Sequence, residues 1–204
     1  MGATIVLPSS EQGASDMQQT TQAQSSSRSG GAFEVDVAGI RAKARQDIES
    51  GAVTEGYRAD REAVLKLLNE ALATEVVCVL RYKRHYFMAR GLNAEPVAAE
   101  FAEHAAEELS HADRIAERIV QLGGEPNLSP VGLLERSHSE YVEASNLQDM
   151  IKENLIAERI AIDSYRQMVD YVGDKDPTTR RLLEEILAVE EEHADDLSDF
   201  LAKN

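Results

Sequence analysis

The chain has 204 residues and a formal net charge of −16, so it has room for one domain with its own core and a tail. The charge argues against direct binding to nucleic acid or to an anionic membrane. A single cysteine, Cys78, excludes an internal disulfide and a cysteine-based zinc or iron–sulfur site within one chain.

The sequence predicts neither a membrane span nor a secretory signal. No stretch reaches the apolar length that a membrane span needs. The first residues, Met1 to Pro8, have neither the basic start nor the apolar segment of a secretory signal. We therefore expect a cytoplasmic protein with no membrane partner.

The N-terminal part is predicted to be a tail and a short helix. Residues 9–31 are rich in Ser, Gln and Thr, a composition that cannot offset the entropy cost of ordering. We predict a disordered tail over residues 1–32, which is a poor DNA-binding arm because it carries only one basic residue. Residues 33–56 are predicted to form a helix and a linker. Asp36 would cap this helix, which runs to about Ser50 and stops at Gly51.

Four long helical patterns follow, each with apolar residues spaced three to four apart. They cover about residues 57–89, 93–122, 147–172 and 176–202. Asn93 and Asp176 are the predicted N-caps of the second and fourth helices. Glycines at or near the ends of the first three helices indicate where each one stops.

The connections between these helices indicate the topology. The second connection, residues 125–146, contains two prolines and a predicted short helix over residues 131–138, and it is long enough to cross a bundle. The other two connections are short, and strand signals are absent. We therefore predict an all-α fold, an antiparallel four-helix bundle, over residues 57–204.

One motif occurs twice. Glu108-x-x-His111 and Glu190-x-x-His193 are each followed by Ala-Asp. Residues i and i+3 of a helix share a face, so each copy presents a carboxylate and an imidazole together. Such a pair suits a first-row transition metal. A single copy on an acidic helix is also common as an ordinary solvated surface.

The first and third helices carry a second repeat. Glu75 and Glu158 are each followed by a tyrosine seven residues later, Tyr82 and Tyr165, about two turns along one face. Both glutamates lie among apolar residues, where an unpaired charge is costly to bury. A solvated surface is therefore a poor explanation for them.

The two repeats combine into a duplicated helical hairpin. The spacing from the single glutamate to the motif glutamate is 33 residues in one half and 32 in the other. Two hairpins packed face to face would bring four carboxylates and two imidazoles together, which is the ligand set of the di-iron carboxylate bundles. The six predicted metal ligands are Glu75, Glu108, His111, Glu158, Glu190 and His193.

Other reactive side chains have plainer interpretations. His104 and His138 lie outside the repeat, and His85 lies in a basic patch, so we interpret all three as structural or surface residues. Cys78 is predicted to be a packed small hydrophobe rather than a redox group.

These motifs resemble the ferritin-like superfamily and, within it, bacterioferritin. The resemblance covers about residues 60–201 and is closest at residues 69–82, 107–128 and 182–195. It implies a ferritin-like fold in which Glu108 and Glu190 bridge two irons. The other two glutamates of the set are then terminal ligands, and each iron has one histidine.

The resemblance also assigns roles beside the metals. Tyr82 matches a tyrosine that can donate an electron, and a core tyrosine hydrogen-bonded to a carboxylate is the alternative. Glu103 and Glu107 match positions that can face the cavity of a bacterioferritin shell, although ordinary acidic surface is the simpler interpretation.

Three departures from bacterioferritin matter. Leu109 stands where that family has a haem-ligating methionine, so no haem is expected. The sequence ends with the fourth helix, whereas bacterioferritin has a fifth. The extra N-terminal helix and the long second connection are similar to Dps-like proteins, which form 12-subunit shells. The cysteine pair of some Dps-like members is absent, and so is a recognisable intersubunit metal site.

We therefore predict a ferroxidase that oxidises Fe(II) with dioxygen or hydrogen peroxide at a di-iron centre. The expected setting is a homo-oligomeric shell, of 12 rather than 24 subunits, that stores or detoxifies iron. The alternatives are a di-iron or di-manganese peroxidase or catalase without mineral storage, a Dps-like DNA-protecting protein, and a metal-free interaction bundle.

Overall fold

The computed structural model describes residues 33–46, 48–92 and 94–203. The predicted tail over residues 1–32 and the predicted cap Asn93 lie outside the described residues. All regular elements in the described ranges are helical. They are α1 (Val37–Lys43), a short 3-10 turn (Ile48–Ser50), α2 (Arg61–Met88), α3 (Ala94–Gln121), α4 (Leu133–Arg136), α5 (Leu147–Val172), a second 3-10 turn (Gly173–Lys175) and α6 (Pro177–Lys203).

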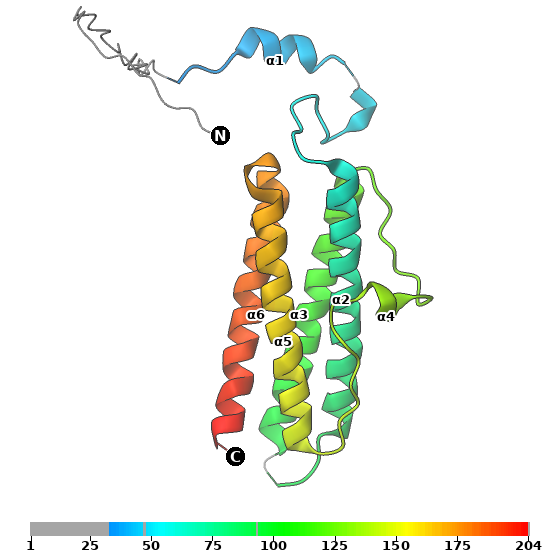
Figure 1. Ribbon diagram of the computed structural model, residues 1–204, viewed down its shortest axis with the longest axis vertical. Coiled ribbons are helices and arrows are strands. Elements are labelled where there is room, and N and C mark those ends of the chain that lie inside the picture. Colours follow the sequence, from blue (N-terminus) through cyan, green and yellow to red (C-terminus); the bar gives the residue numbers. More distant parts are fainter. Residues whose placement is uncertain (1–32, 47, 93, 204) are drawn as a thin grey trace, which may run out of the picture. The chain divides into compact units, whose positions relative to one another are not determined.

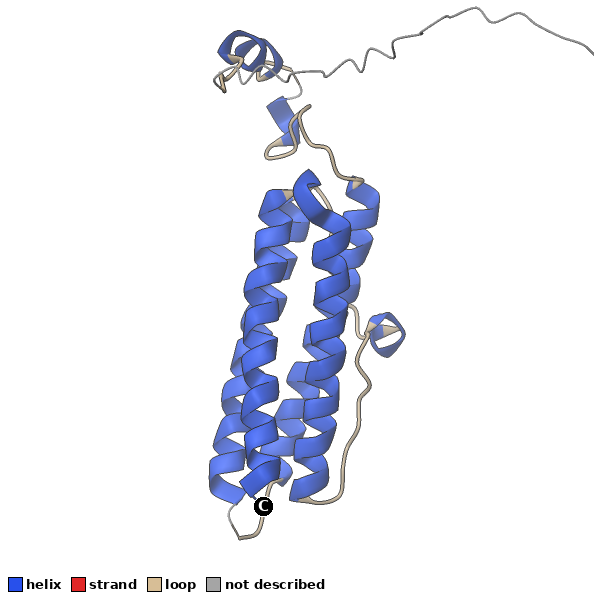
Figure 2. Ribbon diagram, turned by 60° about the vertical axis from the view of Figure 1, so that its left-hand side comes forward, coloured by secondary structure: helices blue, strands red, loops and turns tan. Residues whose placement is uncertain are grey.

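Four long helices lie side by side as a bundle in both ribbon views (Figures 1 and 2). Helix α2 pairs with α3 and α5 pairs with α6, so the bundle is built from two helical hairpins. Within each hairpin the helices run in opposite directions (Figure 1). The predicted all-α antiparallel four-helix bundle is confirmed.

Two predicted helix bounds are wrong. The helix after Asp36 ends at Lys43 instead of continuing to Ser50, and a separate 3-10 turn follows before Gly51, which has a φ of 57°. Helix α2 begins at Arg61 rather than near Tyr57. The side chain of Asp60 accepts a hydrogen bond from the backbone N–H of Ala63 at 3.1 Å, an N-cap that fixes the true start.

The turn after α3 brings two helices close together. Gly123 has a φ of 73°, and the N–H of Gly124 reaches back to the carbonyl of Ile119 at 2.9 Å, which closes the helix end. A Cβ on Gly124 would lie 2.5 Å from a methyl carbon of Leu65 on α2. The glycine pair therefore both ends α3 and allows the hairpin to pack tightly.

The second connection crosses the bundle, as predicted, and is fastened along α2 (Figure 1). Asn69 Oδ1 accepts a hydrogen bond from the backbone of Asn127 at 2.7 Å near one end. Farther along α2, the buried Arg81 donates to the Ser139 hydroxyl and to the Glu140 carbonyl, both at 2.9 Å. These side-chain bonds hold a segment with little secondary structure of its own.

Helix α6 begins at a buried group of hydrogen bonds centred on Asp176. Its carboxylate caps the helix by accepting from the Thr179 N–H at 2.9 Å. It also pairs with the Arg118 guanidinium of α3 at 2.9 and 3.0 Å and accepts from the Tyr57 hydroxyl at 2.9 Å. The predicted N-cap Asp176 therefore also links the two hairpins.

The apolar core is divided into two clusters along the bundle. One contains Leu72, Ala112 and Ile186, and the other contains Tyr82 and Leu197. Each long helix contributes to both clusters, and between its two contributions each helix carries buried charged residues. The fold thus leaves a polar layer in the middle of its core.

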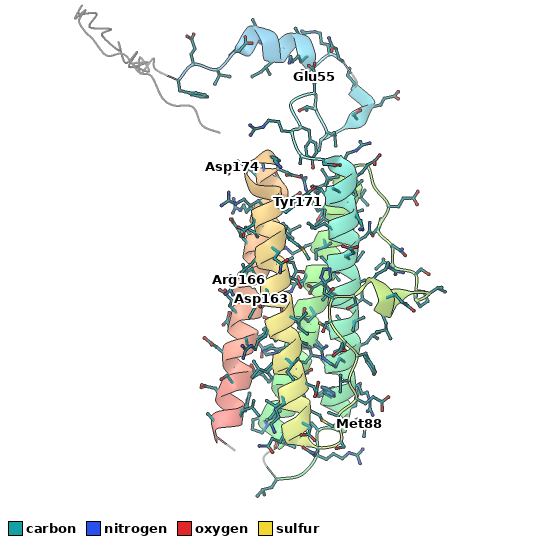
Figure 3. All side chains as sticks on the ribbon, in the orientation of Figure 1. Glu55, Met88, Asp163, Arg166, Tyr171 and Asp174 are labelled. Atoms are coloured by element: carbon teal, nitrogen blue, oxygen red, sulfur yellow. The ribbon has the colours of Figure 1, made fainter. Side chains whose placement is uncertain are left out.

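The outer faces of the helices are charged. Figure 3 shows Asp163 and Arg166 on the outside of α5, where they form an exposed ion pair at 3.4 Å. Such surface pairs contribute little to stability. Within the described ranges, no helix combines the length and apolar character that crossing a membrane requires.

Candidate metal centre

The six side chains predicted as metal ligands all lie in the polar layer between the two apolar clusters. Each long helix contributes at least one of them, and each is at most 3% exposed. Helical geometry explains this, since Glu75, Glu108, Glu158 and Glu190 all fall on the inward faces of their helices. The sequence repeat is therefore a spatial repeat as well.

The donor atoms form two overlapping groups. One group consists of Glu75, Glu108, His111 and Glu190, and the other of Glu108, Glu158, Glu190 and His193. Within each group the donor atoms lie within 4.8 Å of one another. Two glutamates, one from each copy of the motif, belong to both groups.

Distances around the two histidines reflect the same arrangement. Nδ1 of His111 lies 3.1 Å from Glu190 Oε1, 3.4 Å from Glu75 Oε2 and 3.6 Å from Glu108 Oε2. Nδ1 of His193 lies 3.6 Å from Glu108 Oε1 and 3.8 Å from Glu190 Oε2. Each imidazole nitrogen thus faces a set of carboxylate oxygens.

Two tyrosines hold the remaining glutamates in place. The Tyr82 hydroxyl donates to Glu158 Oε1, and the Tyr165 hydroxyl donates to Glu75 Oε1. Each bond crosses from one hairpin to the other, so each hairpin orients a glutamate of its partner hairpin. In each case the second oxygen of the glutamate is left pointing into the site without a hydrogen bond.

The site contains an unusual number of buried polar atoms without hydrogen-bond partners. The six residues account for seven of them, in the described part of the chain: Glu75 Oε2, Glu108 Oε1, His111 Nδ1, Glu158 Oε2, Glu190 Oε1 and Oε2, and His193 Nδ1. An orphaned buried donor or acceptor costs about 1–3 kcal/mol. A set of unpartnered polar atoms that converge on one place therefore suits a bound cation.

The electrostatics of these six residues agree with this interpretation. Burial, reinforced by the charge of Glu108, raises the pKa of both Glu75 and Glu190 well above the usual range. Burial opposes ionisation of Glu108 as well, but the close approach of Glu75 and of the two imidazoles outweighs it and lowers the pKa of Glu108. Burial disfavours the charged imidazoles, yet adjacent carboxylates raise the pKa of His111 to about 10 and of His193 to about 9. Glu75, Glu190 and the two imidazoles therefore tend to hold protons. These protons offset the negative charge of the carboxylates, which a bound cation would otherwise do.

The donor set fits two first-row divalent ions. Carboxylate and imidazole ligands suit iron and manganese, whereas a soft-metal site would require thiolates. Four carboxylates can balance the charge of two divalent cations, and the two shared glutamates offer donor atoms to both positions. Burial raises the pKa of the nearby Cys78 thiol well above its usual range, so this thiol stays protonated and is a poor ligand.

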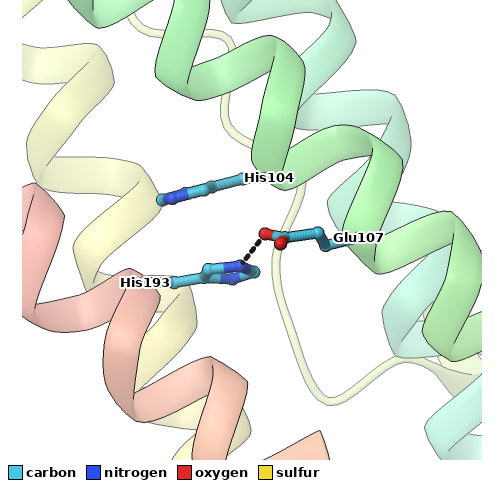
Figure 4. A group of neighbouring side chains, drawn as sticks. All are labelled: His104, Glu107 and His193. Carbon is cyan, nitrogen blue, oxygen red and sulfur yellow. Dashed lines mark hydrogen bonds and ion pairs between the residues drawn. The ribbon is translucent and has the colours of Figure 1, made fainter.

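A histidine that we interpreted from the sequence as structural lies directly beside this site. His104 is 2% exposed, and its ring stacks on His193 with centroids 3.9 Å apart (Figure 4). Glu107 accepts a hydrogen bond from His193 Nε2 at 2.7 Å, which orients the ring so that Nδ1 faces the site. The sequence signal that could have identified His104 is its spacing, because it lies one turn before Glu108 on the same helix face.

The other residues singled out from the sequence lie elsewhere. Leu109 is 51% exposed on α3. His85 is buried and contacts Asn154 and the carbonyl of Val142, and His138 is exposed on the long connection. Glu103 is exposed.

Comparisons with known proteins agree on one relationship. Residues 65–204 match the family model described as ferritin-like domain. Bacterioferritin from Brucella melitensis is 33% identical over 146 residues, covering 69% of this chain and 85% of that protein. A nutrient stress-induced DNA-binding protein from Synechococcus is 32% identical over 140 residues, covering 66% of this chain and 78% of that protein. The bacterioferritin-related protein from Bacteroides fragilis, described as a dodecameric thioferritin, superposes with a TM-score of 0.69 at 34% identity, covering 72% of this chain and 88% of that one.

Proposed function

Because the chain belongs to the ferritin-like domain family, we propose that it is a ferroxidase, which binds two Fe(II) ions in the polar layer of its bundle and oxidises them. The observation that carries this proposal is the pair of overlapping donor groups that share Glu108 and Glu190. Their orphaned, buried oxygen and nitrogen atoms suit two cations placed side by side. Iron is the substrate here, and manganese is the alternative metal.

Each residue of the site has a distinct role in the proposal. Glu75 and His111 would hold one Fe(II), and Glu158 and His193 would hold the other. The two shared glutamates would contribute to both. Tyr82 and Tyr165 fix the terminal glutamates by hydrogen bonds, so that one oxygen of each remains free for metal.

The electron balance requires an external acceptor. Two Fe(II) ions give up two electrons, which with two protons convert dioxygen to hydrogen peroxide, or hydrogen peroxide to two waters. Both acceptors remain candidates. The protein supplies the geometry, the compensating negative charge and an apolar surround on both sides of the site. Tyr82, whose hydroxyl bonds to Glu158, is either a core tyrosine that orients this carboxylate or an electron donor to the same acceptor in place of one Fe(II) ion.

The relatives also bear on assembly. Bacterioferritins are among the sequence relatives, and the Bacteroides fragilis neighbour is described as dodecameric. We propose a cytoplasmic homo-oligomeric shell of 12 subunits, rather than 24, that stores iron. No haem is expected in it, because Leu109 has no donor atom. Solution mass measures the assembly directly, since a shell has about twelve times the 22.4 kDa chain mass and a dimer would argue against storage.

The proposed activity is tested by following Fe(II) oxidation in air with the full chain. The double variant Glu108→Ala, Glu190→Ala should lose both bound iron and oxidation while keeping its helical circular dichroism. The matched control is Glu103→Ala, Glu192→Ala, which removes two exposed glutamates from the same helices. Equal oxidation rates in the double variant and the wild type would refute the proposal.

Iron loading separates storage from the alternative of a peroxidase or catalase. Hundreds of ferric ions retained per particle would support storage. About two metal ions per chain, with rapid peroxide turnover, would favour the di-iron or di-manganese enzyme.

A DNA-protecting role is the other alternative, and the name of the Synechococcus relative is what favours it. The net charge of −16 opposes it, because a DNA-binding surface must compensate phosphates. A gel-shift experiment at physiological salt is expected to show no retardation of DNA.

A further inference from the structure

Arg81 is a buried cation that lies beside the candidate metal centre. It is 1% exposed, and its guanidinium donates four hydrogen bonds. Three of them reach the Asn154 side-chain oxygen, the Ser139 hydroxyl and the Glu140 carbonyl, all at 2.9 Å. The fourth reaches the Cys78 sulfur at 3.5 Å. All four acceptors are neutral, so none of these hydrogen bonds neutralises the positive charge.

Arg118, which is also buried, is arranged differently. Its guanidinium contacts both oxygens of the Asp176 carboxylate, at 2.9 and 3.0 Å, so its charge is neutralised locally. A buried charge without such a partner is strongly unfavourable. The charge of Arg81 must therefore be balanced by negative charge that it does not contact directly.

The glutamates of the metal centre are the nearby negative charges. The guanidinium carbon of Arg81 lies 5.8 Å from the centre of the Tyr82 ring, and the Tyr82 hydroxyl bonds to Glu158. Asn154, which accepts from Arg81, lies one helical turn before Glu158 on α5. Burial disfavours the charged guanidinium, but neighbours that include Cys78 and Glu158 outweigh burial and raise the pKa of Arg81. Arg81 therefore stays charged and acts on the centre through space.

This fixed charge alters the charge balance of a loaded centre. Metal-bound imidazoles are neutral, so two Fe(II) ions and four carboxylates add up to zero, and Arg81 remains as one excess positive charge. Oxidation to two Fe(III) ions adds two more positive charges in the same buried layer. Repulsion by a fixed charge grows in proportion to the charge of the ion, so it is about one and a half times as strong for a trivalent ion as for a divalent one.

We propose that Arg81 prevents the centre from retaining ferric iron, because its fixed charge weakens the binding of Fe(III) more than that of Fe(II). The oxidised pair then leaves, and the centre accepts another pair. The role rests on the proposed ferroxidase function and deepens it, since storage requires a centre that empties, whereas a retained pair would be a cofactor. None of the hydrogen bonds of Arg81 reaches one of the six ligands, so it acts through its charge and is not a catalytic residue.

Ions that are not oxidised under argon measure this charge effect without ferroxidase chemistry. Metal-free full-length protein is titrated with Co(II), read from d–d absorption, and with Tb(III), read from luminescence. Arg81→Met should bind Co(II) roughly tenfold and Tb(III) roughly thirtyfold more tightly than the wild type, because the effect on the binding free energy scales with ionic charge. Arg81→Lys disturbs the same hydrogen bonds but keeps the charge, so both affinities should stay close to those of the wild type.

Two further variants separate the charge of Arg81 from its contribution to the fold. Asn154→Asp keeps the acceptor and supplies the missing carboxylate, so it should tighten binding of both ions, Tb(III) more than Co(II), even if Arg81→Met does not fold. It is measured above neutral pH, because His85 also contacts Asn154 and its pKa is lowered in the wild type by burial. Lys83→Met removes one positive charge from an exposed position of α2, where salt and solvent screen it, and should change neither affinity.

Repeated iron addition tests the role in release. Two Fe(II) ions per chain are oxidised in air, and an equal second addition follows. The wild type and Arg81→Lys should oxidise the second pair as fast as the first. Arg81→Met and Asn154→Asp should oxidise it roughly tenfold more slowly, because the first ferric pair stays bound.

Three results would overturn the proposal. Unchanged Co(II) and Tb(III) affinities in Asn154→Asp, or equal tightening in Arg81→Met and Arg81→Lys, would show that the charge of Arg81 does not act on the centre. A fast second round of oxidation in Asn154→Asp would refute the role in release. Failure of the ferroxidase proposal looks different, because the wild type would then leave Fe(II) unoxidised while the differences in Co(II) and Tb(III) binding persist.

Discussion

Replacing Glu190 by glutamine should stabilise the metal-free protein while destroying its metal site. Glu190 is fully buried, and neither of its carboxylate oxygens has a hydrogen-bond partner. Burial and three neighbouring glutamates raise its pKa well above the ordinary value of 4.5. A glutamine of the same shape removes the ionisable group and adds an N–H donor for the remaining carboxylates. Satisfying one orphaned buried group corresponds to about 1–3 kcal/mol in the free energy of unfolding.

The gain should depend on pH in a defined direction. Since the folded protein holds a proton on Glu190 more tightly than the unfolded chain does, stability is lost as the pH rises from 4.5 through the raised folded pKa. Glu190→Gln removes that loss. The increase in stability should therefore be largest at neutral pH and above, and it should vanish below about pH 4.

The assay is thermal and urea unfolding of protein treated with a chelator, followed by the same measurements with Fe(II) under argon. For a chain of this size, 1 kcal/mol shifts Tm by about 2–4 °C. The wild type should gain stability from metal, by about 2.7 kcal/mol at a metal concentration 100 times Kd, and the variant should gain much less.

The matched control for this experiment is Glu192→Gln, an exposed residue of the same helix, which should change stability by less than about 0.5 kcal/mol. If metal-free Glu190→Gln is less stable than the wild type at pH 7, repulsion among the buried carboxylates does not destabilise the fold. The cation site inferred from its orphaned atoms would then be wrong.

Three further predictions concern Asp176, Gly124 and Tyr82. Asp176→Ala should lower the free energy of unfolding by about 3–5 kcal/mol, because it leaves Arg118 buried without its carboxylate partner. Since hydrogen bonds to Asp176 lower its pKa against the effect of burial, its contribution in the wild type should be lost as the pH falls below its ordinary value of 3.8, which acid titration of stability measures. Gly124→Ala should cost roughly 1–3 kcal/mol in urea unfolding, because the new Cβ meets Leu65, with no change in Fe(II) oxidation per folded chain. Tyr82→Phe should keep two metal ions per chain but slow oxidation, and wild-type kinetics in this variant would rule out the electron-donor role.

Periodicity was sufficient to predict the long helices. Helix α5 begins and ends at the predicted residues, Leu147 and Val172, because a capping asparagine and a terminal glycine are local signals. The start of α2 was predicted less well. Tyr57 fits the apolar pattern of that helix, but its hydroxyl bonds to Asp176, more than a hundred residues away, and no local signal reports such a contact.

The residues of the candidate site were predictable because duplication encodes them in spacing. Residues three apart in a helix share a face, so each Glu-x-x-His motif presents both side chains together. Two matched hairpins that pack face to face bring the two motifs to one centre. Sequence could not reveal what surrounds that centre. His104 has no counterpart in the other half, so no repeat marked it, and its stacking on His193 depends on how α3 packs against α6.

The sequence by itself determined the helices, their pairing into duplicated hairpins and the six candidate ligands, since these follow from local periodicity and from repetition. Only the tertiary structure decided that the carboxylates are buried with orphaned oxygens and that two tyrosines brace them from the opposite hairpin. It alone showed that His104 stacks on His193 beside the site. The physical reason is that burial and donor geometry depend on contacts between residues far apart in the chain, whereas spacing within a helix does not.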